Sequence, residues 1–191
     1  PVVRQPKELA KALGPVLRSA VQLRFVDPYF DADDSSFFEP MKEYLLVAQE
    51  RRTIGDLRIQ VHFSVTSENI QQASRIESRP MNEGDVARSR LAACYRKLQP
   101  LLMPGVTVRA FAWGERPRGP KLHNRYVLTE VGGIAVQTGL DRSQRVTGQT
   151  DDLTILSKEQ HAARWSEYRA ESTVYRLISD FTFTAVPSAS G

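Results

Sequence analysis

Strand-like and helix-like patterns alternate along the first part of the chain, and this alternation constrains the fold more than any other feature. Apolar and more polar residues alternate from Leu57 to Val65, which predicts a strand with one buried face. The same pattern in shorter form predicts strands at residues 21–26 and 106–113. Helical spacing separates these strands, so crossovers join them, and crossovers favour parallel pairing.

The remaining patterns complete an α/β order. Helices are expected at residues 7–20, at residues 36–52 and from Asn82 to the stop signal Pro104-Gly105. Further strands are expected at residues 122–129, 133–138 and 153–156, with Gly132-Gly133 as a hairpin turn. Ser157 and Gln160 form a capping box that begins a last long helix, with helical spacing as far as Ile178. We predict a single α/β domain over residues 1–191, with a mixed, mostly parallel sheet flanked by helices and a frayed tail at residues 187–191.

The composition is that of an ordinary globular protein, with 41% hydrophobic and 25% charged residues. No apolar run approaches the roughly 20 residues of a membrane span, and residues 1–7 lack the apolar core of a signal peptide. Pro1 in place of an initiator Met is consistent with a segment of a longer protein. The lone Cys94 excludes an internal disulfide and falls among apolar residues of a predicted helix, so we expect it to be buried. We expect a cytoplasmic protein without a transmembrane segment.

The positive charge is concentrated in one stretch. The chain has a net charge of +4, and residues 109–125 account for all of it, because five basic residues there face the single acidic residue Glu115. These basic residues are Arg109, Arg116, Arg118, Lys121 and Arg125. A localised basic patch indicates an anionic partner, such as nucleic acid, a phospholipid headgroup or a nucleotide. The alternative is a solvated loop in which the charges cluster by chance.

An imidazole, a guanidinium and a carboxylate follow within residues 121–130, on what the pattern predicts to be one strand. Side chains alternate faces along a strand, so His123 and Arg125 would point to the same side. Such a pair can bind a phosphate, because the guanidinium donates two parallel hydrogen bonds and a neutral imidazole acts as nucleophile or proton carrier. The alternative is a strand whose polar face is simply hydrated.

Four carboxylates follow the predicted strand at residues 21–26. Asp27 lies at the carboxyl end of that strand, where sites in α/β sheets gather. Together with Asp31, Asp33 and Asp34 it could bind a hard cation, but the spacing lacks the Gly and the distal Glu of an EF-hand loop. We favour capping of the next helix by Asp34 or a neighbouring serine, and we assign no metal ligand.

The other two histidines receive no functional role. His62 shares the polar face of the strand at residues 57–65, so we expect it to be solvated. His161 lies near the start of the last helix, and we expect it to be structural or solvated. The connection at residues 66–81 lacks clear periodicity and is expected to be mobile, functional or partly helical. Residues 142–151 form a second polar segment.

Three motifs, taken in order, resemble one half of the phospholipase D superfamily. The family motif is His-x-Lys, then four residues, then Asp, followed by a Gly/Ser-x-Asn element. Here His123-Asn124-Arg125 and Glu130 keep the spacing, with Arg in the place of Lys and Glu in the place of Asp. Thr138-Gly139-Leu140-Asp141 stands near the final element, with Asp in the place of Asn. The resemblance covers approximately residues 20–180.

The resemblance to the catalytic superfamily implies a metal-independent phosphodiesterase or nuclease that acts on nucleic acid without a cofactor. His123 would be the nucleophile that forms a phospho-histidine, and Arg125 and Lys121 would hold the phosphate. The imidazole would be oriented, or its cation stabilised, by Asp27, Glu130 or Asp141. A complete site takes two such motifs, so activity would require a homodimer that places two copies of His123 across a two-fold axis.

A divergent branch implies the opposite function. Asp27-Pro28-Tyr29 at a strand end and the Gly-Leu-Asp ending resemble the phospholipase-D-like C-terminal domain of MIT-domain proteins and its bacterial relatives. In that branch the site is degenerate, and the domain binds lipid headgroups or protein partners. The same basic groove would then hold an anionic ligand through Arg116, Arg118, Lys121 and Arg125. Arg in place of Lys changes reach and geometry, so the sequence leaves both functions open.

Overall fold

The computed structural model describes residues 1–50, 56–142 and 149–185. Its helices are α1 (Pro6–Ser19), α2 (Ser35–Gln49), α3 (Ser67–Ile76), α4 (Glu83–Leu98) and α5 (Lys158–Glu167), with a short 3-10 turn at Gln99–Leu101. Its long strands are β2 (Gln22–Val26), β3 (Leu57–Ser64), β4 (Val106–Gly114) and β9 (Arg176–Thr184). Shorter strands are β1 (Val2–Val3), β5 (Tyr126–Thr129), β6 (Gly133–Val136), β7 (Thr150–Asp151) and β8 (Leu153–Ile155).

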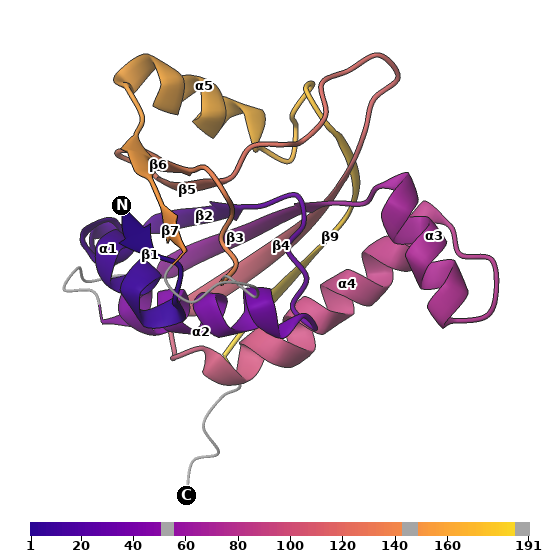
Figure 1. The fold of residues 1–191 in the computed structure, drawn as a ribbon, viewed down its shortest axis with the longest axis horizontal. Helices are drawn as coiled ribbons and strands as arrows, with labels where there is room; N and C mark the ends of the chain where they lie inside the picture. The colour runs from indigo at the N-terminus through magenta and orange to yellow at the C-terminus, as the bar shows by residue number, and fades with distance from the viewer. Residues whose placement is uncertain (51–55, 143–148, 186–191) are drawn as a thin grey trace, which may run out of the picture.

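Seven strands form one mixed sheet in the order β8-β6-β5-β2-β3-β4-β9, which confirms the predicted α/β class (Figure 1). β2 and β3 pair in parallel, and so do β3 and β4. The strand pairs on either side of these three central strands are antiparallel: β2 with β5, β5 with β6 and β6 with β8 on one side, and β4 with β9 on the other. The sheet is therefore less parallel than predicted, because the crossovers end at β4 and the later strands return as hairpins and edges.

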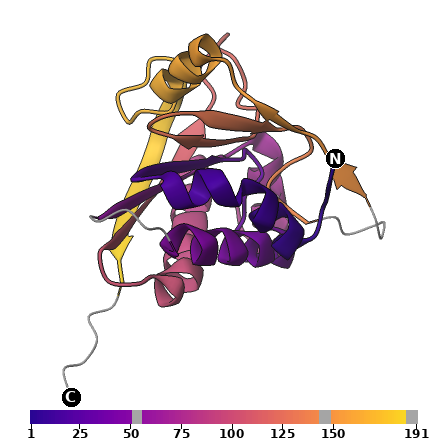
Figure 2. The same ribbon diagram turned by 90° about the vertical axis from the view of Figure 1, so that its left-hand side faces the viewer.

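Helices cover both faces of the sheet. α1, α2 and α4 lie on one face, and α5 lies on the other (Figures 1 and 2). The α1 side holds the larger apolar core, where Leu13 and Leu17 meet Leu45 of α2 and the inward side chains of β2 to β4. Cys94 is buried in this core, as predicted. Within the described residues no helix has both the length and the apolar character needed to cross a membrane.

The second face is aromatic, and it corrects the prediction for His62. The His62 side chain has no exposed surface, and its ring lies parallel to that of Phe111 with centroids 4.6 Å apart. Trp113 and Tyr168 complete its surroundings. His62 is buried on the polar face of β3 because Phe111, Trp113 and Tyr168 surround it, whereas Arg58 on the same face is exposed. His161 has a structural role, since its Nε2–H donates to the carbonyl of Thr129 at 2.8 Å.

The predicted last helix is too long. α5 begins with the predicted capping box at Ser157 but ends at Glu167, and residues 176–184 form the edge strand β9, antiparallel to β4. Phe181 and Phe183 alternate with threonines, which is a strand pattern. Residues 176–184 form a strand and not a helix because pairing with them satisfies the backbone N–H and C=O groups along the open edge of β4.

Three further predictions have clear outcomes. Residues 66–81 are partly helical, as one alternative held, because Thr66 and Asn69 form a capping box that begins α3. The Gly132-Gly133 hairpin is confirmed by the antiparallel pairing of β5 with β6. The strand predicted at residues 122–129 begins only at Tyr126, so residues 121–125 are not part of it. The frayed tail and most of the polar segment 142–151 lie outside the described residues.

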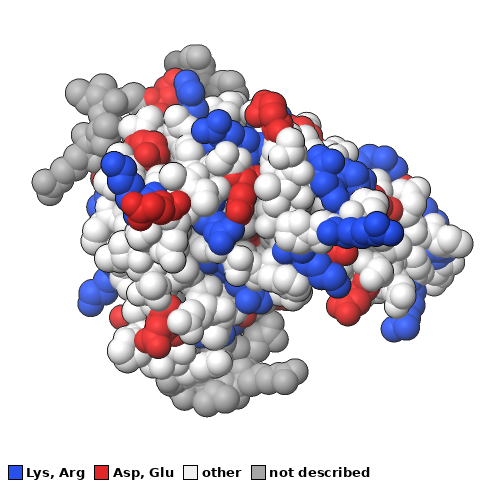
Figure 3. All heavy atoms as spheres, turned by 90° about the horizontal axis from the view of Figure 1, so that it is seen from above, with Lys and Arg blue, Asp and Glu red and all other residues white. Residues whose placement is uncertain are grey.

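Positively charged side chains are unevenly distributed over the face that carries α5. Seen from above, lysine and arginine gather on the side where the β4–β5 connection and α3 lie, interspersed with fewer acidic groups (Figure 3). The connection itself, residues 115–125, contains four basic residues and one acidic residue. The charge concentration found in the sequence therefore lies on the surface, next to the carboxyl ends of β3 and β4.

Candidate functional site

The carboxyl ends of β2, β3 and β4 open into a cavity of about 430 Å³. Pro28 and Tyr29 follow β2, Val65 follows β3, and Glu115 follows β4, so each parallel strand contributes to the wall. Ligands bind at this end of parallel strands in open α/β sheets, because the loops there are free to vary while the strands hold them in place. The cavity is therefore the first candidate for a binding site.

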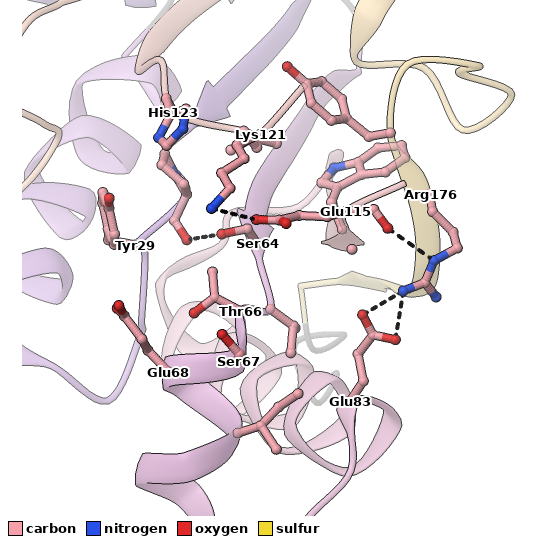
Figure 4. A pocket seen from close by; sticks show the side chains of 17 residues that line it. Tyr29, Ser64, Thr66, Ser67, Glu68, Glu83, Glu115, Lys121, His123 and Arg176 are labelled. Carbon is pink, nitrogen blue, oxygen red and sulfur yellow. Dashed lines mark hydrogen bonds and ion pairs between the residues drawn. The ribbon is translucent and has the colours of Figure 1, made fainter. Parts of the chain in front are cut away.

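The wall of the cavity is built from distant parts of the chain. Tyr29 and His123 lie on one side of it, and Glu83 and Arg176 lie on the other (Figure 4). Lys121 extends between them. The N-cap residue Thr66 and the first two residues of α3, Ser67 and Glu68, close the remaining side.

Two of the basic groups in the cavity already have acidic neighbours. The Arg176 guanidinium donates to both carboxylate oxygens of Glu83, at 2.6 and 2.8 Å. The Lys121 ammonium lies 3.9 Å from Glu115, and its side chain is 62% exposed, so this second pair is loose. Glu68 adds a third carboxylate to the wall. The lining is thus slightly acidic, although the segment beside it is basic.

His123 is exposed at the mouth of the cavity. Within the described part of the chain it makes no hydrogen bond or ion pair, and so no carboxylate orients its ring. Leu122 and Tyr126 on either side are buried and anchor the segment in the aromatic layer. His123 and Arg125 do share a surface, since both line a smaller hollow of about 270 Å³ beside β5 and β6. Their common side comes from the irregular segment between Leu122 and Tyr126 and not from a strand.

Asp27, Arg125 and Asp141 are brought together, as the three motifs implied. The buried Asp27 carboxylate accepts hydrogen bonds from the backbone N–H of Tyr29 at 3.0 Å and of Leu140 at 2.9 Å. Burial raises the pKa of Asp27, and nearby Arg125 partly opposes this rise. Burial also raises the pKa of Asp141, against the effect of its ion pair with Arg4 at 2.6 Å.

The Arg125 guanidinium is held loosely. It lies over the ring of Tyr29, 5.1 Å from the centroid, and donates to the carbonyl of Gln137 at 3.4 Å. Its Nε is buried and has no hydrogen-bond partner among the described residues. Cation–π contact fixes its position over the ring but uses none of its N–H donors. Arg125 therefore has unused donors next to the exposed imidazole of His123.

Glu130 does not belong to this site. Its carboxylate accepts hydrogen bonds from the backbone N–H of Val21 at 3.0 Å and of Gln22 at 2.9 Å. These groups lie at the start of β2, whereas Asp27 follows its end, about 16 Å away for a strand of this length. The prediction that Glu130 orients His123 is wrong, because β5 runs antiparallel to β2 and carries Glu130 to the opposite edge of the sheet.

Arg109 also lies elsewhere. It sits within β4, where its Nε donates to Asp180 of β9 at 2.7 Å and its guanidinium covers Phe111. Arg116 ties its loop to the carbonyls of Ser172 and Tyr175. Arg118 is exposed and, among the described residues, has no ion pair. The predicted phosphate-binding set thus divides into one strand residue, one partly engaged arginine and the freer Arg118 and Lys121.

The four carboxylates that were considered as ligands of a cation each have a different partner. Asp33 pairs with Arg96 at 2.7 Å, and Asp31 lies 3.9 Å from Arg90. Asp34 caps α2, as predicted, by accepting from the backbone N–H of Ser36. In the described ranges no three His, Cys, Asp or Glu side chains are grouped closely enough to hold a metal ion.

Several wall residues carried no sequence signal. Glu83 and Arg176 are separated by more than ninety positions and meet only because β9 returns beside β4. Arg4, which lies outside the wall, reaches Asp141 because β1 pairs with β7. Tyr29 had a weak signal, as the residue after Asp27-Pro28, whereas Glu68 lies in the connection at residues 66–81 and had none. Comparison with known proteins adds nothing to these assignments, because no protein-family model and no curated protein matches the chain.

Proposed function

We propose that this chain is a phospholipase-D-like module that does not catalyse, and that it docks the phosphate backbone of nucleic acid. The docking surface is the basic rim, which we define as Arg116, Arg118, Lys121 and Arg125. One observation carries the proposal. The rim is exposed beside the cavity with unused donors, while the carboxylates that a histidine nucleophile would need are bound to other groups.

The donors on the rim support binding. Arg118 is exposed, the contact of Lys121 with Glu115 is long, and among the described residues the terminal nitrogens of Arg125 make only one hydrogen bond, at 3.4 Å to the carbonyl of Gln137. The rim contributes four cations from ten consecutive residues, and each phosphate contact would release a counterion from a nucleic acid. Nucleic acid offers several phosphates in succession, which favours it over an isolated headgroup.

The surroundings of His123 weigh against catalysis. A nucleophilic or basic imidazole needs a hydrogen-bonded group that fixes its orientation and stabilises its cation. Glu130 is bound at the far edge of the sheet, Asp141 is bound to Arg4, and Asp27 is bound to two backbone N–H groups. None of these three carboxylates hydrogen-bonds the His123 ring.

The test is a binding titration with fluorescent single-stranded DNA, single-stranded RNA and duplex DNA in EDTA, with NaCl between about 50 and 200 mM. We expect dissociation constants on the order of 1–100 µM near physiological salt, with a strong salt dependence. Lys121→Ala should weaken binding to every sequence and lower the magnitude of the salt slope by about 1. The matched control is Lys11→Ala, which removes the same charge from an exposed position on α1.

Three results would overturn the proposal. Cleavage of any of these strands in EDTA, lost in His123→Ala, would establish catalysis and require a search for the second half of the site in a homodimer. Equal binding by the Lys121→Ala and Lys11→Ala variants would show that the rim is not the contact surface. Binding to vesicles that contain anionic lipid, without binding to any oligonucleotide, would identify a lipid headgroup as the ligand instead.

A further inference from the structure

The charge of the cavity differs from that of the rim beside it. The rim is basic, whereas the cavity is lined by three carboxylates, from Glu68, Glu83 and Glu115, and by two cations, from Lys121 and Arg176. Arg176 is bound to Glu83, and Lys121, which the cavity shares with the rim, has only its loose contact with Glu115. A phosphate inside the cavity would lose its hydration and meet three carboxylates against two cations. The rim suits a phosphate, and the cavity does not.

We infer that the cavity receives an unpaired nucleobase of a single strand whose phosphates lie on the rim. This inference rests on the proposed function and names its substrate class. Base edges carry amino and imino N–H donors, which carboxylate and hydroxyl oxygens accept. Glu68 and Ser67 present such oxygens along the α3 side of the cavity, next to Thr66, whose hydroxyl caps α3.

Tyr29 gives the base a surface on which to stack. Its side chain is 49% exposed, although it lies between the buried residues Pro28 and Phe30. Arg125 lies over the ring, so the ring is held in place and connected to the rim. His123 is exposed on the same side of the cavity (Figure 4). Aromatic side chains beside a positive groove are the usual means by which proteins hold single strands without reading their sequence.

The size of the cavity agrees with one base. Its volume of about 430 Å³ lies within the roughly 300–1,000 Å³ of pockets that enclose small organic ligands. A base that is paired and stacked inside a duplex would have to leave the stack before it could enter, and that step costs energy. A single strand does not bear most of this cost, so it should bind more tightly than a duplex of equal length.

The experiment compares three probes of equal length at one salt concentration: single-stranded DNA, its duplex, and a strand whose central nucleotides lack bases. We expect the single strand to bind about 10-fold more tightly than the duplex or the abasic strand. Tyr29→Ala should weaken binding of the normal strand by about 10-fold and leave binding of the abasic strand unchanged. Tyr29→Phe should retain normal binding.

The abasic probe separates stacking from the support that Tyr29 gives to Arg125. If Tyr29→Ala weakens both strands equally, the ring serves only to position Arg125, and the inference is wrong. Tyr95→Ala is the matched control, because Tyr95 is 40% exposed on α4 and packs against Phe181 and Phe183, away from the cavity.

The remaining outcomes distinguish the two proposals. Equal affinity for all three probes, with binding weakened by Lys121→Ala, would leave the rim as a backbone-binding surface and remove the base from the cavity. No binding to any probe would remove both proposals together.

Discussion

Trp113 donates its indole N–H to Nδ1 of His62 at 3.0 Å, inside the aromatic layer beneath α5. Because that nitrogen accepts a hydrogen bond, the imidazole is neutral, and its Nε2–H is left to donate to Gln60 at 3.2 Å. Burial lowers the pKa of His62 well below its usual value, and the charges of Arg24 and Arg109 lower it further.

This buried neutral histidine predicts a loss of stability in mild acid. The pKa in the unfolded chain is about 6.5, above the folded value, so between the two the unfolded state binds the extra proton. The free energy of unfolding should therefore fall as the pH drops below about 6.5, by at most about 2 kcal/mol from this group between pH 7 and pH 5. Urea unfolding of the wild type and of His62→Phe at pH 7 and pH 5 measures this fall in the free energy of unfolding.

The comparison isolates His62 from the other buried groups. Asp27 acts in the opposite direction, because burial raises its pKa and the folded state takes up its proton first as the pH falls. Both proteins contain Asp27, so its contribution cancels in the difference. Equal acid sensitivity of the wild type and His62→Phe would contradict the prediction.

Asp27→Ala should destabilise the fold even though Asp27 stands at a candidate site. The substitution leaves the backbone N–H of Leu140 without its acceptor in a buried place and removes a second bond to Tyr29. We expect a loss of about 3 kcal/mol in urea unfolding, typical of hydrogen bonds to a buried charge. Asp33→Ala is the control, because the exposed pair of Asp33 with Arg96 should contribute less than about 1 kcal/mol.

Gly139→Ala should also be costly. The φ angle of Gly139 is +128°, a conformation that L side chains rarely adopt, and an added Cβ would collide with the Asp141 carboxylate. A loss of about 1–3 kcal/mol is expected from the backbone strain. Gly132→Ala provides the comparison, since nothing lies within 4 Å of a Cβ at Gly132. Similar thermal unfolding curves for the two variants would show that the chain accommodates the new methyl group.

Glu130→Ala should separate structure from binding. The substitution removes the acceptor for the N–H groups of Val21 and Gln22, so the free energy of unfolding should fall by about 1–3 kcal/mol. Nucleic-acid affinity of the folded variant should stay that of the wild type, because Glu130 lies at the far edge of the sheet. A variant with normal stability and weakened binding would return Glu130 to the functional site.

The sequence was sufficient for the parts of the fold that rest on local signals. The alternation at residues 57–65, the caps at Asp34 and Ser157 and the Gly132-Gly133 turn all predicted elements that formed. Two elements required information from distant residues. Residues 176–184 became a strand because β4 offered them an open edge, and His62 of β3 became buried because Phe111, Trp113 and Tyr168 surround it.

The candidate site was predictable in its centre and not in its walls. The motifs correctly grouped Asp27, Arg125 and Asp141, since a strand end and a hairpin placed them on one edge. The same reasoning failed for Glu130, because the spacing of His123 and Glu130 in the sequence does not give their distance in space. β5 separates them and places Glu130 beside the start of β2. The ion pair of Glu83 with Arg176 depends on β9, which the helical interpretation had excluded.

The pairing of β9 with β4 leaves the nascent chain with an unpaired strand edge while it is being synthesised. β4 leaves the ribosome some sixty residues before its outer partner, so one edge of the nascent sheet stays open during that interval. Open edges with alternating apolar residues pair readily with other chains. Synthesis of this protein therefore passes through a stage in which the unpaired backbone N–H and C=O groups along the edge of β4 are displayed to neighbouring polypeptides, and pairing with β9 ends that exposure.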